Sequence, residues 1–251
     1  MLRVITVTVW LTALAAAQGP LRYQTRRIEK KAPRCLVSFE YPEIISAASP
    51  EVRDRINAEI LGVLLRRSDW PASDSGVRSL EAYAKMFVEY CEKYHDGRNE
   101  LENRPLYERK TVKFFRATPP VFSFQCVADA DAGGVHPFGT TFYVNFESKT
   151  GKTVKLLDIL KPGALEQLTS LAESHFRKDH KLSATESLSE TGFNFPGDRF
   201  NLNDNYGIGD KALVFHFNTY EIGPGATGAT EIEIPYTDVR HLMKPGSGLQ
   251  R

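Results

Sequence analysis

The first half of the chain contains two stretches in which apolar residues recur at helical spacing. Ser49-Pro50-Glu51 gives the first stretch an N-cap, a proline for its first turn and an acid near its positive end, and we expect this helix to run to about Arg67. Ser79 caps the second stretch, which we expect to end near 96–97. Both apolar stripes are typical of helix faces that pack on a core. Their members are Val52, Ile56, Ile60, Val63 and Leu64 in the first helix, and Leu80, Tyr83, Ala84, Phe87, Val88 and Cys91 in the second.

Elsewhere the apolar residues alternate with a period of two, as they do in half-buried strands. The strand-like segments are 35–41, 106–115, 121–127, 142–146, 154–156, 200–202, 212–217 and 230–234. Lys149-Thr-Gly151-Lys joins 142–146 to 154–156 by a tight turn, which makes this pair the clearest hairpin. A third helix is expected over 165–176. Hairpin-linked strands with helices early and in mid-chain predict an α+β fold, with a largely antiparallel sheet and helices packed on one side.

The N-terminal residues have the pattern of a secretory signal peptide. Met1-Leu2-Arg3 is followed by an apolar run that ends in small residues, so cleavage is expected after Ala17. A retained anchor is the alternative, but a membrane-spanning helix needs about 20 apolar residues. We therefore predict a signal peptide at 1–17, a basic N-terminal arm or leader strand at 18–34, a single α+β domain at 35–244 with possible subdomains 35–104 and 105–244, and a tail at 245–251. The mature protein is expected to be secreted or periplasmic, not membrane-spanning after signal cleavage, and monomeric.

Composition and charge narrow the choice of partners. Apolar residues make up 41% and charged residues 25% of the chain, as in ordinary globular proteins. Lys and Arg number 32 and Asp and Glu 31, and removal of Arg3 with the leader leaves 31 against 31. A duplex-binding protein usually has a basic excess. Nucleic acid is therefore not an expected partner.

Three cysteines, Cys35, Cys91 and Cys126, can form one disulfide in an oxidising compartment. The sequence leaves all three pairings open, and three inert core thiols remain an alternative. Their wide spacing is a poor zinc signature, so no metal and no cofactor is expected.

No familiar catalytic motif is present: the sequence lacks GxSxG, a P-loop, HExxH and GxGxxG after a strand. The histidine with the strongest functional signal is His136, which lies in the glycine-rich turn 133–137. It has either an acid–base role or a structural one in which its ring bonds loop carbonyls. Asp129 and Asp131 precede this turn but lack the later bidentate acid of a calcium loop. We expect no catalytic residue. The alternative is a small hydrolase or metal-dependent enzyme centred on His136, with Glu221 or Asp129 nearby.

A second segment with a functional signal, 217–228, combines aromatic residues with three glycines. Glycine permits close approach of another chain, and aromatic side chains dominate many binding surfaces. The alternative is a hairpin end in which Asn218 and Tyr220 fix the backbone. The predicted binding residues from both loops are His136, Pro137, Tyr220, Glu221, Pro224, Gly225 and Gly228.

Several segments together resemble a known family. The early marks are Cys35 to Tyr41 with Pro42 and Ile56-Asn57; the later ones are Gly134-Val-His136-Pro137, Asn145-Phe with Lys149-Thr-Gly151-Lys, Leu156-Leu-Asp158-Ile-Leu160, Ala212 to Ile222 and Ile234-Pro235-Tyr236. The opening is similar to the extracytoplasmic module of the lysozyme-responsive anti-sigma-V factor and to the N-terminal module of a peptidoglycan deacetylase. The second half resembles domain of unknown function 3298.

The resemblance implies a non-catalytic binding module of the cell envelope that recognises a protein of lysozyme type or a peptidoglycan fragment through surface loops. We expect neither a sigma-binding segment nor a deacetylase domain in this chain. Pro224-Gly225-Ala226 stands where relatives often carry Pro-Tyr-Ala, and the loss of such an aromatic anchor costs on the order of 2 kcal/mol in an interface.

Overall fold

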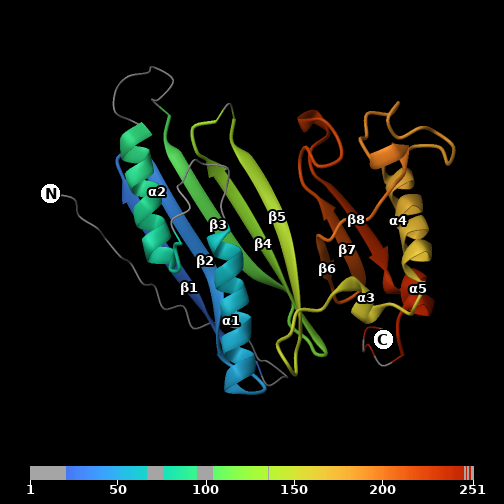
Figure 1. Ribbon diagram of the computed structural model, residues 1–251, viewed down its shortest axis with the longest axis horizontal. Coiled ribbons are helices and arrows are strands. Elements are labelled where there is room, and N and C mark those ends of the chain that lie inside the picture. Colours follow the sequence, from blue (N-terminus) through green and yellow to red (C-terminus); the bar gives the residue numbers. More distant parts are fainter. Residues whose placement is uncertain are drawn as a thin grey trace. The chain divides into compact units, whose positions relative to one another are not determined.

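A computed structural model describes residues 21–66, 76–94, 104–134, 136–245, 247 and 249 (Figure 1). The predicted signal peptide and most of the predicted tail lie outside these residues. The α+β fold is confirmed, with two mostly antiparallel sheets and helices beside them. The chain forms two compact units: unit 1 comprises Met1–Lys113 and Cys126–Thr140, and unit 2 comprises Phe114–Gln125 and Thr141–Arg251. The division between the units therefore does not follow a single cut in the sequence.

A five-stranded sheet has its strands in chain order. They are β1 (Arg22–Ala32), β2 (Cys35–Ser46), β3 (Leu106–Arg116), β4 (Val121–Asp131) and β5 (Phe138–Glu147). Strands β1 and β2 are antiparallel, whereas β2 and β3 are parallel because two helices lie between them in the chain. Of the two alternatives for the basic N-terminal segment, the leader strand is the one present as β1. No helix of the described residues has the length and apolarity needed to cross a membrane.

Helix α1 (Pro50–Leu65) packs on β2, and helix α2 (Leu80–Tyr94) packs on β1 and β2 (Figure 1). The N-caps at Ser49 and Ser79 are confirmed, since their Oγ atoms accept hydrogen bonds from the first turns. The buried positions of both helices are those the apolar stripes predict. Asn57 extends this packing by bonding both the N–H and the C=O of Ile44 on β2, at 2.8 and 2.9 Å.

A disulfide between Cys35 and Cys91 ties the start of β2 to α2, with 6.1 Å between the Cα atoms. This selects one of the three pairings that the sequence left open. Cys126 is a buried free thiol.

An ion pair lies inside unit 1 beneath the two helices. Glu108 and Lys110 on β3 are both buried, and Lys110 Nζ is 2.9 Å from Glu108 Oε1. The Tyr83 hydroxyl donates to the Glu108 carboxylate at 2.9 Å, and Lys110 Nζ donates to the carbonyls of Leu64 and Arg66. A cation at the C-terminus of α1 satisfies its last carbonyls.

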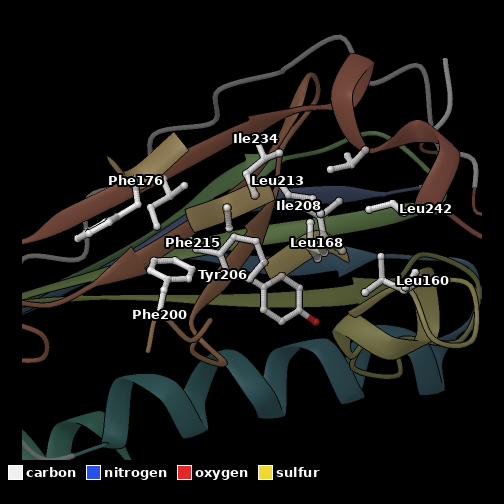
Figure 2. Packing of buried hydrophobic residues seen from close by; sticks show 14 of the residues in the cluster. Leu160, Leu168, Phe176, Phe200, Tyr206, Ile208, Leu213, Phe215, Ile234 and Leu242 are labelled. Carbon is white, nitrogen blue, oxygen red and sulfur yellow. The ribbon is translucent and has the colours of Figure 1, made fainter. Parts of the chain in front are cut away.

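Unit 2 contains a three-stranded antiparallel sheet covered by one long helix. Its strands are β6 (Tyr206–Ile208), β7 (Ala212–Phe217) and β8 (Thr230–Pro235), and α4 (Leu165–Asp179) contacts β8. Figure 2 shows side chains of this helix and of the three-stranded sheet in one apolar cluster, including Leu168 and Phe176 of α4 and Phe215 of β7. The short helices are α3 (Leu156–Ile159), α5 (Tyr236–Val239), η2 (Pro196–Asp198), η3 (Gly225–Thr227) and η4 (Arg240–Leu242).

Of two strand predictions in unit 2, one is confirmed in part and the other is wrong. The hairpin that starts at 142–146 is present but short: it has one antiparallel bridge, between Phe146 and Thr153, and the Val154 N–H donates to the Asn145 carbonyl at 2.8 Å. It ends there because the Lys155 N–H donates to Asp158 Oδ2 at 2.8 Å and the chain turns into α3. The strand at 200–202 is absent: Phe200 is buried as a single side chain in the core, and the strand forms later, as β6.

Candidate functional site

The turn between β7 and β8, Asn218–Gly228, presents the most exposed aromatic side chain among the large apolar residues of the described chain. We name this segment the Tyr220 loop. Tyr220 is 59% exposed, and its backbone lies in the left-handed region with φ of 71°. A Cβ atom on Gly225 would overlap the Tyr220 ring, so the ring rests directly on the backbone of Gly225. The loop therefore holds an exposed phenol ring in a fixed position.

Hydrogen bonds around Glu221 fix the backbone beneath this ring. One Glu221 carboxylate oxygen accepts from the Asn218 N–H at 2.8 Å, and the other accepts from Asn203 Nδ2 at 2.7 Å. The Glu221 N–H donates to the Asn218 carbonyl at 3.0 Å. Both oxygens of this predicted binding residue are thus engaged within the chain.

The remaining predicted residues of the loop, Pro224, Gly225 and Gly228, lie in and beside the short helix η3. Pro224 is exposed and precedes the short helix η3, whose ends are closed by bonds from Thr227 to Pro224 and from Gly228 to Gly225. Gly228 has φ of 72°, a conformation that side chains rarely adopt, which explains a glycine at this position.

Asparagine side chains join the Tyr220 loop and β6 to β5, and sequence reasoning missed this role. We call Asn145, Asn205 and Asn218 the asparagine bridge. Asn218 Oδ1 accepts from the Thr141 N–H at 2.7 Å, and Asn205 donates to the Thr141 carbonyl at 2.7 Å. The partners lie more than 60 residues apart in the chain, so no local pattern indicates them.

Asn145 is the buried member of the asparagine bridge. Its Oδ1 accepts from Ser123 Oγ at 2.7 Å and from the Ile208 N–H at 3.0 Å, and its Nδ2 donates to the Tyr206 carbonyl at 2.9 Å. An amide side chain thus takes the place of a backbone partner between β5 and β6.

The sequence analysis also missed a polar cluster on β4, β5, β7 and β8. Tyr143 Oη lies 3.5 Å from Glu231 Oε2 and accepts from Gln125 Nε2 at 2.8 Å. Burial raises the pKa of Tyr143 to about 12. His216 faces Glu231 across the β7–β8 ladder, with Nδ1 3.5 Å from the same carboxylate oxygen. The available sequence clue is that His216 lies within the alternating strand-like segment 212–217.

The second predicted loop, around His136, belongs to unit 1 and is described separately from the Tyr220 loop. Tyrosines of α2 hold its start: Tyr90 donates to the Ala132 carbonyl at 2.7 Å and Tyr94 to the Gly133 carbonyl at 3.1 Å. His136 and Pro137 are exposed, and His136 Nδ1 lies 3.1 Å from the Pro137 carbonyl. A contact between the ring and a loop carbonyl is what the structural alternative predicts, and it leaves the acid–base alternative untested.

The two aspartates before this loop have structural contacts. Asp131 is buried, accepts from the Gly133 N–H at 3.1 Å and lies 3.2 Å from Arg104. Asp129 accepts from the Tyr107 hydroxyl at 3.2 Å. Within the described residues, no group of three or more His, Cys, Asp or Glu side chains could hold a metal ion.

Residues 157–237 match the model of a family described as protein of unknown function, DUF3298. The predicted resemblance of the second half to this domain is confirmed. The matched residues include the whole Tyr220 loop but neither His136 nor Asn145. None of the curated proteins matches the chain.

Two solved structures share the fold. A DUF3298 family member from Bacteroides fragilis has a TM-score of 0.69 at 19% identity, over 93% of this chain and 98% of that chain. A DUF3298 family protein from Pseudomonas aeruginosa has a TM-score of 0.63 at 18% identity, over 91% of this chain and 96% of that chain. At these identities the likeness concerns the fold alone.

Proposed function

We propose that this protein is a non-catalytic binding module of the cell envelope, secreted or periplasmic, which uses the Tyr220 loop to recognise a protein of lysozyme type or a cell-wall glycan. The observation that carries the proposal is the exposed Tyr220 ring on a backbone with φ of 71°. A non-glycine residue in this region costs about 1–3 kcal/mol, and such strain is concentrated at sites that bind or switch. At Tyr220, this strained backbone conformation keeps an aromatic side chain at the surface.

The loop has the features of a prepared binding anchor. Tyrosine is enriched among the residues that dominate interface energies, and it loses little side-chain entropy on binding. Because the Tyr220 ring already rests on Gly225, a partner would not have to order it. The ring also covers the position where relatives in the resembled family often carry an aromatic residue of their own. In this proposal, Tyr220 supplies the aromatic anchor that Gly225 lacks.

Two features support an envelope location. The N-terminal sequence has the signal-peptide pattern, and disulfides such as Cys35–Cys91 persist mainly in oxidising compartments. The resemblance that the sequence suggests between the opening segments and envelope modules would agree with this location.

The direct test is retention of the purified protein on immobilised lysozyme and on insoluble peptidoglycan. Tyr220→Gly removes the ring and suits the positive φ, so this variant should fold and yet bind at least about tenfold more weakly. Leu157→Ala is the matched control, because Leu157 is a 62% exposed apolar residue on α3. Unchanged binding by Tyr220→Gly, or no retention of the wild type on either material, would refute the proposal.

Activity assays separate the proposal from its alternatives. Added protein that slows lysozyme in a cell-wall turbidity assay would make the module an inhibitor, with the binding role intact. Incubation of the protein with peptidoglycan should release no soluble fragments. Release that disappears in His136→Ala would overturn the non-catalytic assignment and favour the hydrolase alternative.

A further inference from the structure

Strand β1 is the outer strand of the five-stranded sheet, and its residues belong to unit 1. It spans Arg22–Ala32, and in the described chain its only strand partner is β2. Eleven extended residues cover about 36 Å, and about half of their backbone N–H and C=O groups point away from β2. None of the eleven is buried, and none is proline. The edge is therefore long enough and open enough to pair with another extended chain.

The charge of this edge is one-sided. Strand β1 carries five basic residues and one acid, Glu29. Glu29 is paired with Arg27 and Lys31, and Arg26 is paired with Glu43 of β2. Arg22 and Lys30 have no ion pair within the described part of the chain. Two cations at this edge are thus available to an outside group.

Basic side chains stand on both faces of the edge. Residues directly opposite each other on an antiparallel ladder share a face, so Lys30 lies on the face of Val37, which is buried beneath the helices. Arg27 and Lys31 pair with Glu40 and Leu36 and lie on the opposite face. An added strand would therefore meet cations with both its odd and its even side chains.

A free sheet edge can pair with a second copy of itself or with a strand of another protein, and the charge of β1 distinguishes these two cases. A second copy of β1 would place five basic residues beside five, and like charges in cross-strand pairs are destabilising. Lysines on an edge also hinder unspecific aggregation, which is the purely protective explanation of this composition. Neither consideration disfavours an acidic strand, which gains both ladder hydrogen bonds and charge complementarity.

We infer that β1 is a docking edge for an extended acidic segment of a partner protein, which adds to the sheet as a sixth strand. This surface is separate from the Tyr220 loop, and its occupancy does not depend on the proposed function of that loop. The attraction between the basic side chains of β1 and the acidic segment should weaken with salt, because exposed charges are screened within about 10 Å at 0.1 M ionic strength.

The test uses a fluorescent peptide of about twelve alternating glutamate and threonine residues, titrated with the purified protein. A control peptide of the same length and charge carries prolines at both odd and even positions, so it cannot form a ladder. We expect anisotropy to report binding of the first peptide and at least about tenfold weaker binding of the second. Amide hydrogen exchange should slow within 22–32 when the first peptide is bound.

Charge reversal supplies the matched variants. Arg22→Glu combined with Lys30→Glu breaks no ion pair within the described residues, so folding is preserved, and binding should weaken at least tenfold. Lys178→Glu, at an exposed position of α4, is the control and should bind as the wild type does. Equal binding of the two peptides would indicate general attraction of anions and overturn the inference. Absence of binding, or exchange protection only outside 22–32, would overturn it as well.

Discussion

Replacement of Asn145 by alanine should destabilise the protein far more than loss of an ordinary surface asparagine. Asn145 is 3% exposed, and its side chain bonds Ser123 Oγ, the Ile208 N–H and the Tyr206 carbonyl. Ser123 and Ile208 are fully buried and Tyr206 is 6% exposed. Water has little access to any of the three groups that alanine would leave unpaired.

The magnitude follows from these three partners. A buried polar group that loses its partner costs about 1–3 kcal/mol. Part of this cost is relieved if a water molecule enters the space of the lost amide, so we expect a total of about 3–5 kcal/mol. This is a large share of the 5–15 kcal/mol typical of a whole domain.

Urea unfolding followed by circular dichroism measures the effect. With a slope of about 2–3 kcal/mol/M, the midpoint should fall by about 1–2 M. Ser123→Ala removes one of the three bonds and should cost about 1 kcal/mol, which keeps the reasoning testable if Asn145→Ala fails to fold. Asn201→Ala, at an exposed position, should change stability by less than about 0.5 kcal/mol. A loss below about 1 kcal/mol for Asn145→Ala would refute the bridging role.

Three further predictions concern unit 1. Glu108→Gln leaves the buried Lys110 ammonium without its counter-charge and should lower the free energy of unfolding by about 3–5 kcal/mol in the same urea assay. Burial raises the pKa of Cys126 to about 11, so the native thiol should react with a disulfide reagent at pH 8 at least about 100-fold more slowly than the urea-unfolded thiol. The folded state holds this proton more tightly than the unfolded state, so its contribution to stability should decline as pH rises from about 9 to 11. Replacing both Cys35 and Cys91 by serine opens a loop with a sequence separation of 56 and should lower the thermal or urea stability by about 4 kcal/mol, and an unchanged midpoint would contradict this estimate.

The sequence predicts unit 1 better than unit 2 because its helices carry strong local signals. Ser49 and Ser79 mark where α1 and α2 begin, and the two apolar stripes give the buried faces residue by residue. Local patterns cannot show that α1 and α2 leave β2 and β3 parallel, since strand direction depends on the path between strands. They also cannot select Cys35–Cys91 over the other pairings, because Cys126 occupies an equally apolar position.

Unit 2 depends on contacts that are remote in the chain. The segment around Phe200 is rich in asparagine and glycine, so its one large apolar residue suggested a strand, whereas the structure uses it as a core side chain. Strand β6 contains only Tyr206–Ile208 and has too few residues to show alternation. Asn205 beside it bonds Thr141, a partner 64 residues away. The sequence identified the Tyr220 loop from its glycines and aromatics, but the fixed position of the ring depends on Asn203 and Gly225, which only the fold brings together.

In the Tyr220 loop, which lies within the residues that match the DUF3298 model, most side chains build the scaffold of the turn. In the run from Asn218 to Ile222, Asn218 and Glu221 bond the chain itself and Ile222 is buried, while Tyr220 alone of the apolar side chains is exposed. A protein can share this run and keep the turn without sharing a partner, because the bonds that shape the turn do not involve the exposed ring. Under the proposed function, recognition by proteins with this turn should accordingly vary with residue 220 and with residue 225, on whose backbone the ring rests. Exchanging only these positions between two such proteins is expected to exchange their ligands and leave their stability nearly unchanged.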